Sequence, residues 1–267
     1  MQHRAKKSLG QNFLKSKSAL SAMVSAGDIN AGDIVLEIGP GKGALTERML
    51  LFAGKVIAIE KDDVLIPLLK EKFAKEIKSG KLDLIHRDAL EFDPEVLKFY
   101  EHSYKLIANI PYYITGAIFK KFLEETTHQP ETIVLLVQKE VSDRIVARDG
   151  KESILSISVK AYGTPKYIKK IPARDFSPAP KVDSAIIAIE NISKKNFKDI
   201  SEKRFFEILK TGFAHKRKVL IKNLEVLFER EKLTEVFTKE SPLGISEKSR
   251  AEELSIESWL SLVKELS

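Results

Sequence analysis

Short apolar runs of strand length recur through the first half of the chain and alternate with segments whose apolar residues have helical spacing. The five runs are IVLEIG (34–39), KVIAIE (55–60), LDLIHR (82–87), YKLIANI (104–110) and ETIVLLVQ (131–138). Near-continuous apolar runs are typical of strands that are buried on both faces of a parallel sheet. Their alternation with helical segments predicts a doubly wound α/β domain.

Two of the intervening segments carry the apolar stripe of a helix that covers a sheet. The stripe residues are Leu45, Met49 and Phe52 in the first segment, and Leu65, Leu68, Leu69 and Phe73 in the second. Residues with this spacing lie on one side of a helix. We expect these side chains to face the sheet.

The pattern changes after residue 165. KYIKKI (166–171) and SAIIAIE (184–190) are predicted strands with no helix between them, which favours an antiparallel hairpin at the edge of the sheet. The stretch 191–201 is polar and lacks clear periodicity, and the apolar residues beyond it again have helical spacing. We therefore expect a Rossmann-like domain over residues 1–190 and a small all-α domain over residues 191–267.

Charge is unevenly distributed along the chain. Lys and Arg total 45 against 38 Asp and Glu, which gives a formal net charge of +7. Two segments, 2–17 and 210–222, contain several basic residues and no acidic ones. Such segments favour a polyanion such as a nucleic acid, although a solvated face or a membrane surface fits the charge alone.

The amino-acid composition excludes several kinds of site and of protein. The chain has no cysteine, which excludes disulfides, a thiolate nucleophile and Cys-ligated zinc. Its start, QHRAKKSLGQNFLKSK, is too polar for a signal peptide, and no apolar run reaches the length of a membrane span. We expect a cytoplasmic protein with no membrane partner.

The first predicted strand runs into LEIGPGKGA, in which Gly39, Gly41 and Ala44 form a G-x-G-x-x-A pattern. Small residues at a turn between a strand and a helix allow a ligand to approach the backbone closely. The helix N-terminus favours an anion, either a dinucleotide pyrophosphate or the carboxylate of S-adenosylmethionine. A tight turn without a ligand is the alternative.

Two carboxylates follow the next two strands. Glu60 ends the second strand, where it can accept hydrogen bonds from both ribose hydroxyls of NAD or S-adenosylmethionine. Asp88 follows the third strand and can accept a bond from an adenine amino group, although taken singly it is more typical of a turn or a helix N-cap. The carboxyl ends of parallel strands meet at one crevice, so we expect Gly39, Glu60 and Asp88 around one elongated ligand.

The fourth strand runs into NIPYY, which combines an amide, a proline and two aromatic rings at the same crevice. The side-chain oxygen of Asn109 and the carbonyl of Ile110, which precedes Pro111, can accept two hydrogen bonds from an exocyclic amine. Tyr112 offers a flat surface for a base that has left its stack. The plainer alternatives are a turn-forming asparagine and a core tyrosine.

Four motifs together, GQNFL (10–14), LEIGPGKG, NIPY and FSPAPKVDS (176–184), resemble the small-subunit (16S) rRNA adenine N6,N6-dimethyltransferase family over essentially the whole chain. The resemblance implies a Rossmann-like, S-adenosylmethionine-dependent methyltransferase domain with a small helical C-terminal domain. It also implies dimethylation of two adjacent adenosines in a hairpin loop near the 3′ end of small-subunit rRNA. The expected partner is that rRNA or the immature small ribosomal subunit.

The same resemblance assigns roles by motif. Cofactor binding would fall to Asn12, Leu14, Gly39, Gly41, Glu60, Asp88 and Asn109. The reaction centre would consist of Asn109, Ile110, Pro111, Tyr112 and Phe176, with the two aromatic rings stacked on the target base. The resemblance calls for no metal, and we expect a monomer.

Basic side chains at both ends of the chain would hold the RNA. They are Lys6, Lys7, Lys216, Arg217 and Lys218. The segment 213–224 is similar to the family's basic helix, but it has lysine at 216 and 218 where arginine is frequent. Lysine neutralises phosphate without the bidentate geometry of arginine, so we expect binding with weaker geometric specificity.

Three alternative functions share parts of this pattern. A sister group that methylates large-subunit rRNA also has NIPY and the glycine loop, but GQNFL, PKVDSA and the long C-terminal region favour the small-subunit group. A ribosome-assembly factor could keep the fold without catalysis, although an intact NIPY argues against it. A NAD-dependent dehydrogenase would share the glycine loop and Glu60 but would leave NIPYY unexplained.

Overall fold

The computed structural model describes residues 6, 10–99, 104–237 and 245–267. Contacts divide the chain into two compact units. The first comprises the residues up to 142 together with 164–192, and the second comprises 143–163 together with 193–267. Within the described ranges, no helix is both long enough and apolar enough to span a membrane.

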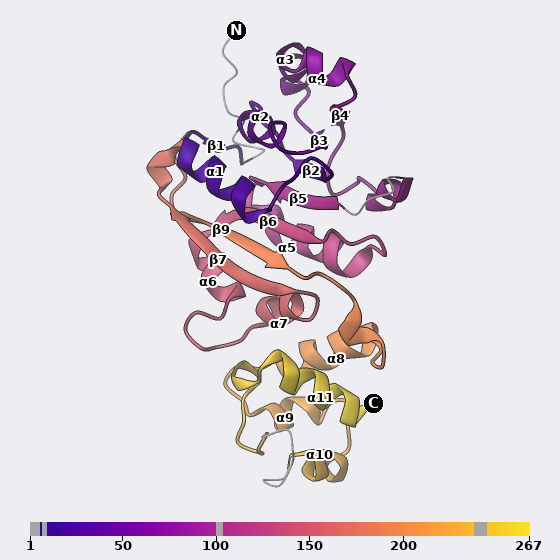
Figure 1. The fold of residues 1–267 in the computed structure, drawn as a ribbon. Helices are drawn as coiled ribbons and strands as arrows, with labels where there is room; N and C mark the ends of the chain where they lie inside the picture. The colour runs from indigo at the N-terminus through magenta and orange to yellow at the C-terminus, as the bar shows by residue number, and fades with distance from the viewer. Residues whose placement is uncertain (1–5, 7–9, 100–103, 238–244) are drawn as a thin grey trace. The chain divides into compact units, whose positions relative to one another are not determined.

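The first unit is built on a seven-stranded sheet in the order β4-β3-β2-β5-β6-β9-β7 (Figure 1). The strands are β2 (Ile34–Ile38), β3 (Lys55–Glu60), β4 (Leu82–His86), β5 (Tyr104–Ala108), β6 (Thr132–Gln138), β7 (Thr164–Ile171) and β9 (Ser184–Glu190). The strands from β2 to β6 are parallel, whereas β9 is antiparallel to both β6 and β7. The five predicted strands and the edge hairpin are confirmed, and the fold is Rossmann-like.

Short helices precede the first of these strands or connect one strand to the next. They are α1 (Lys17–Ala26), α2 (Ala44–Met49), α3 (Leu65–Lys72), α4 (Ala74–Lys78), η2 (Pro94–Phe99), η3 (Tyr112–Ile114), α5 (Thr115–Phe119), the π-helix η4 (Lys120–Glu125), α6 (Lys139–Ile145) and η5 (Ala173–Asp175). Between β4 and β5, the described residues form the 3-10 helix η2 in place of the expected α-helix. Asp93 accepts a hydrogen bond from the Glu95 amide at 3.0 Å, a local turn that competes with α-helical bonding.

The predicted apolar stripes are only partly buried. The buried members are Leu45, Met49, Leu65, Leu69 and Phe73. Phe52 and Leu68 are 50% and 43% exposed, so for these two side chains the prediction is wrong. Because α2 ends at Met49, Phe52 lies beyond the helix. On α3 the buried residues are Leu65, Ile66 and Leu69, and Leu68 lies on the flank of the side that they form.

Two motifs that are distant in the sequence meet in a second, two-stranded sheet. β1 (Phe13–Leu14) pairs antiparallel with β8 (Phe176–Ser177). The Lys15 amide extends this pairing by donating to the Asp175 carbonyl at 2.8 Å. GQNFL is thereby joined to FSPAP, and α1 follows directly.

The second unit is helical. Its elements are α7 (Ile154–Lys160), η6 (Lys195–Phe197), α8 (Glu202–Gly212), α9 (Leu220–Leu224), α10 (Arg230–Val236), η7 (Ala251–Glu253) and α11 (Ile256–Leu266). Although α7 precedes the boundary expected at residue 190, it groups with this unit. The ring of Tyr162, just after α7, stacks on Phe206 with centroids 6.2 Å apart, and its hydroxyl donates to Glu202. The chain therefore contributes to the helical unit twice.

Close packing at the end of α8 leads to a first prediction. A Cβ on Gly212 would lie 2.5 Å from the Trp259 ring and 2.8 Å from Leu220. We expect Gly212→Ala to destabilise the helical unit by roughly 1–3 kcal/mol, because an overpacked core must shift. Urea unfolding measures this, followed by circular dichroism and by fluorescence of the single tryptophan, Trp259.

Gly116→Ala is the matched control, since among the described atoms none lies within 4 Å of the added Cβ. It should leave the unfolding midpoint unchanged or slightly higher, because Gly116 lies in helix α5 and alanine favours a helix over glycine. An equal loss of stability in both variants would contradict the packing argument.

Candidate active site

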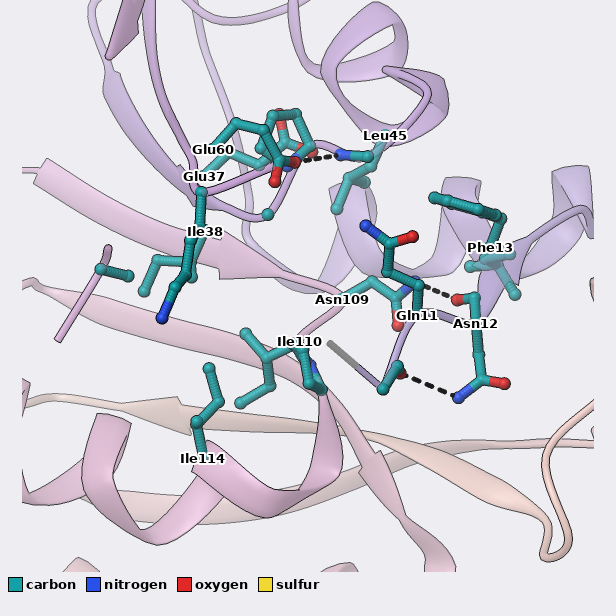
Figure 2. A pocket seen from close by; sticks show the side chains of 18 of the residues that line it. Gln11, Asn12, Phe13, Glu37, Ile38, Leu45, Glu60, Asn109, Ile110 and Ile114 are labelled. Atoms are coloured by element: carbon teal, nitrogen blue, oxygen red, sulfur yellow. Dashed lines mark hydrogen bonds between the residues drawn. The ribbon is translucent and has the colours of Figure 1, made fainter. Parts of the chain in front are cut away.

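The carboxyl ends of the parallel strands meet at a cavity of about 540 Å³ in the first unit (Figure 2). All the residues predicted to bind a cofactor line it, namely Asn12, Leu14, Gly39, Gly41, Glu60, Asp88 and Asn109. Ile110, Pro111 and Tyr112 line it as well, whereas Phe176 is not part of the lining. The structure thus brings together GQNFL, the glycine loop and NIPYY.

Three glycines shape the loop between β2 and α2. Gly39, Gly41 and Gly43 have φ values of +68°, +59° and +75°, a conformation that other residues rarely adopt. A Cβ on Gly41 would lie 3.0 Å from the Phe13 ring, and one on Gly43 would lie 2.5 Å from Phe73. The sequence pattern gave the third small position to Ala44 and missed Gly43, whose place directly before Ala44 in GPGKGA was the available signal.

Glu60 lines the cavity beside this loop. Its side chain is buried, and its two carboxylate oxygens accept bonds from the amides of Gly41 at 3.0 Å and Asp62 at 2.8 Å. Burial raises the pKa of Glu60, and the backbone donors oppose that rise. Because each carboxylate oxygen has a second lone pair, the group can still accept bonds from ligand hydroxyls.

Asp88 takes the turn-forming role that its position suggested, and its role toward an adenine amino group stays a prediction. One carboxylate oxygen accepts from the Leu90 amide at 2.9 Å, which is the turn-forming role, and the other pairs with Lys61 at 2.6 Å. The hydrogen bond from Lys61 lowers the pKa of Asp88, so the side chain lines the cavity as an ionised acceptor.

Asn109 follows β5 and is held by the N-terminal motif. Its side-chain amide Nδ2 donates to the Asn12 carbonyl at 3.3 Å, as Figure 2 shows. Among the described residues, none donates to the Asn109 Oδ1 or to the Ile110 carbonyl. Two acceptors are therefore left at the cavity wall, next to the fixed turn at Pro111, where φ is −57°.

Tyr112 is half-buried and its hydroxyl is fixed. It lies 2.6 Å from the hydroxyl of Ser184, a fully buried residue at the start of β9. Burial raises the pKa of Tyr112. Sequence reasoning missed Ser184, although it is the last residue of FSPAPKVDS.

Phe176 has a different environment from the one expected. It is 2% exposed, lies on β8 opposite Leu14 and belongs to the hydrophobic core of the first unit. In this conformation it anchors the loop that carries FSPAP. Stacking on a base would require the ring to leave the core, so that role stays a prediction.

The basic residues also differ in their surroundings. Lys6 pairs with Asp62 at 2.7 Å and with Asp63 at 2.9 Å, so its charge is matched within the protein. Lys7 lies outside the described residues. Lys216, Arg217 and Lys218 are exposed, but they lie in the connection before α9 and not on the expected helix.

A buried amide accounts for that difference. Asn223 of α9 donates through Nδ2 to the carbonyl of Gly212 at 2.6 Å and to that of His215 at 3.3 Å. These bonds hold the basic connection in a non-helical conformation after α8 has ended.

The family model for ribosomal RNA adenine dimethylase matches residues 2–267. The chain belongs to this family. A relative named Ribosomal RNA small subunit methyltransferase A, from Dehalococcoides mccartyi (strain CBDB1), is 41% identical over 98% of this chain and 88% of its own length. A relative with the same name from Fusobacterium nucleatum subsp. nucleatum is 38% identical over 99% of this chain and 98% of its own.

Solved structures agree with this membership. A dimethyladenosine transferase from Plasmodium falciparum is 28% identical, with a TM-score of 0.76, over 94% of this chain and 95% of its own. The 23S rRNA methyltransferase ErmE has a TM-score of 0.78 over 96% of this chain and 99% of its own. At 24% identity, the likeness to ErmE establishes the fold alone.

The cavity also has a buried acid in its lining that sequence reasoning did not single out. Glu37 is 1% exposed, lines the cavity and accepts a bond from the Thr46 hydroxyl at 2.6 Å. Burial raises its pKa from an ordinary 4.5 to about 8. The folded protein therefore keeps Glu37 protonated at neutral pH.

This proton makes stability depend on pH. Between the ordinary pKa of 4.5 and the folded value of about 8, the unfolded chain has Glu37 ionised while the folded protein retains the proton. Stability must then fall as pH rises through this window, by at most roughly 1.4 kcal/mol per pH unit. We expect Glu37→Gln, which keeps an acceptor for Thr46, to flatten that decline in thermal unfolding from pH 5 to 8. A variant with the same pH slope as the wild type would refute the assignment.

The contact between Tyr112 and Ser184 predicts coupled kinetic effects. Ser184→Ala should release the Tyr112 ring and lower the rate of methyl transfer about tenfold, typical of losing one positioning bond in an active site. Tyr112→Phe should lose a similar factor, and the double variant should be no worse than either. Single-turnover rates test this, and additive losses would mean that Ser184 acts separately from Tyr112.

Proposed function

We propose that this protein dimethylates N6 of two adjacent adenosines in the 3′-terminal hairpin loop of small-subunit (16S) rRNA, with S-adenosylmethionine as donor. The observation that carries the proposal is the position of Asn109 Oδ1 and the Ile110 carbonyl in the same cavity as the glycine loop and Glu60. Membership of the family and the names of relatives near 40% identity support the substrate class.

The chemistry of the residues that line the cavity suits the donor. At Gly39, none of the described atoms lies within 4 Å of an added Cβ, so its backbone is open to a charged ligand end. Glu60 and Asp88 present carboxylates after β3 and β4. We assign the methionine end to Asn12, Leu14, Gly39 and Gly41, the ribose to Glu60 and the adenine to Asp88. When bound, S-adenosylmethionine supplies a methyl group that is electrophilic because it is attached to a sulfonium.

Asn109 and Ile110 would prepare the target amine for attack. The amine of adenine is a weak nucleophile because its lone pair is delocalised into the ring. Two acceptors that each take one N–H bond would favour a pyramidal nitrogen and direct its lone pair toward the donor. The nitrogen becomes acidic once it is methylated, so the proton can leave to solvent and the proposal assigns neither a general base nor a metal.

Residues around this pair would hold the base and the RNA. Tyr112 lies beside Asn109 and provides a ring for a base that has been flipped out of its stack. The exposed connection Lys216–Lys218 would neutralise phosphates. Lys6 is a weaker candidate, because Asp62 and Asp63 already match its charge. A cytoplasmic monomer that acts on the immature small subunit stays a prediction.

Transfer of labelled methyl from S-adenosylmethionine tests the proposal directly. Unmethylated small subunits and large-subunit rRNA are offered separately, and the labelled nucleoside is identified by chromatography after nuclease digestion. Dimethyladenosine from the small subunit alone is the expected result. Label in large-subunit rRNA would identify the sister activity, and tight binding to the subunit without transfer would identify an assembly factor.

Substitutions in the two halves of the cavity should separate chemistry from binding. Asn109→Ala should lower kcat by about 100-fold or more, typical of removing one preorganised polar group, with little change in donor affinity. Glu60→Ala should instead weaken donor binding, with a smaller effect on kcat. Equal losses in both parameters for Asn109→Ala would contradict its assignment.

A further inference from the structure

Tyr113 is the most exposed large apolar or aromatic side chain in the lining of the cavity. It is 68% exposed, whereas its neighbour Tyr112 is half-buried and bonded to Ser184. Both residues belong to the 3-10 helix η3, in which successive side chains point about 120° apart. The two rings therefore cannot serve the same ligand group.

The Tyr113 ring packs against the N-terminal GQNFL motif. A Cβ on residue 10 would lie 3.4 Å from Cε1 and 3.5 Å from Cδ1 of Tyr113, so the ring packs against the bare backbone of Gly10. Gly10 has a φ of +61°, and its carbonyl accepts a bond from the Asn12 side chain at 3.1 Å. The turn that supports Tyr113 thus belongs to the same motif that holds Asn109.

The surroundings of Tyr113 suit single-stranded RNA. Leu90 is 39% exposed and also lines the cavity, and its carbonyl accepts a bond from Lys121 at 2.9 Å. Arg87, another lining residue, is exposed, and among the described residues no hydrogen bond or ion pair engages its guanidinium, whereas its backbone amide donates to the Glu60 carbonyl at 3.0 Å. An exposed ring in a lining that also carries an exposed cation is the combination that holds a stacked base and its phosphate.

From these observations we propose that Tyr113 is a stacking platform for the nucleoside that flanks the target adenosine. The inference rests on the proposed function, because only a flipped target leaves a neighbouring base at the mouth of the cavity. The donor is a poorer occupant, since Glu60, which is assigned to its ribose, is buried, whereas the Tyr113 ring is 68% exposed. The target base is also a poorer one, because Asn109 and Tyr112 lie together on the inner wall.

Hairpin RNAs test this platform. One carries two adjacent adenosines in its loop, and two others lack the base of either adenosine, so that the remaining adenosine is the only one of the pair that can be methylated. RNA affinity, the initial rate of methyl transfer and the KM for S-adenosylmethionine are measured for the wild type, Tyr113→Ala and Tyr113→Phe. Phe52→Ala is the matched control, because Phe52 is 50% exposed and does not line the cavity.

Tyr113→Ala should weaken binding of the two-adenosine hairpin about tenfold, typical of one lost base–aromatic stack, while Tyr113→Phe and Phe52→Ala stay within about twofold. For the wild type, removing the base of at least one of the two adenosines should weaken RNA binding by a similar factor. For Tyr113→Ala, the same removal should leave RNA binding almost unchanged. The KM for S-adenosylmethionine should not change.

The proposal would be overturned if Tyr113→Ala and the missing base weakened RNA binding additively in both of the hairpins that lack a base. A raised KM for S-adenosylmethionine with unchanged RNA affinity would also overturn it and would make Tyr113 a cover for the donor. If the wild type methylates no RNA adenosine, the proposed function fails. If it methylates normally and Tyr113→Ala is indistinguishable from it, only this inference fails.

Discussion

The site depends on one constraint, which is that a segment preceding the sheet must reach the carboxyl edge of its parallel strands. The ends of β2, β3 and β5 supply the glycine loop, Glu60 and Asn109, but none of them fixes the Asn109 amide. That contact comes from the Asn12 carbonyl, and β1 holds Asn12 in place by pairing with β8. Without this closure the Asn109 side chain could rotate and lose its orientation toward the cavity.

The electrostatics of the cavity follow from the same arrangement. Parallel strands bring several carboxylates to one edge, and unscreened acids at close range would repel each other. The protein resolves this in three ways: Glu37 holds a proton, Glu60 accepts two backbone amides, and Asp88 pairs with Lys61. In each case the carboxyl oxygens can still accept hydrogen bonds from the hydroxyl and amino groups of a ligand.

Local patterns were sufficient for the sheet and most of the lining. The apolar runs predict the strands because burial on both faces leaves little room for polar residues, and the motifs at the strand ends then meet by topology. The local sequence pattern does not predict contacts between distant segments of the chain. The two-residue strands β1 and β8, the bond from Tyr112 to Ser184 and the pairing of Lys6 with Asp62 depend on how the folded chain closes. Phe176 illustrates the same limit, because its motif suggested a function while its burial is decided by packing against β1.

The most direct test of this account is a crystal structure of the protein with S-adenosylhomocysteine, the product of the proposed donor. The account predicts ribose hydroxyls on Glu60, the adenine amino group on Asp88 and the sulfur within about 4–5 Å of Asn109, close enough for an in-line methyl transfer. A ligand whose ribose contacts neither Glu60 nor its neighbours, or whose sulfur lies away from Asn109, would contradict it.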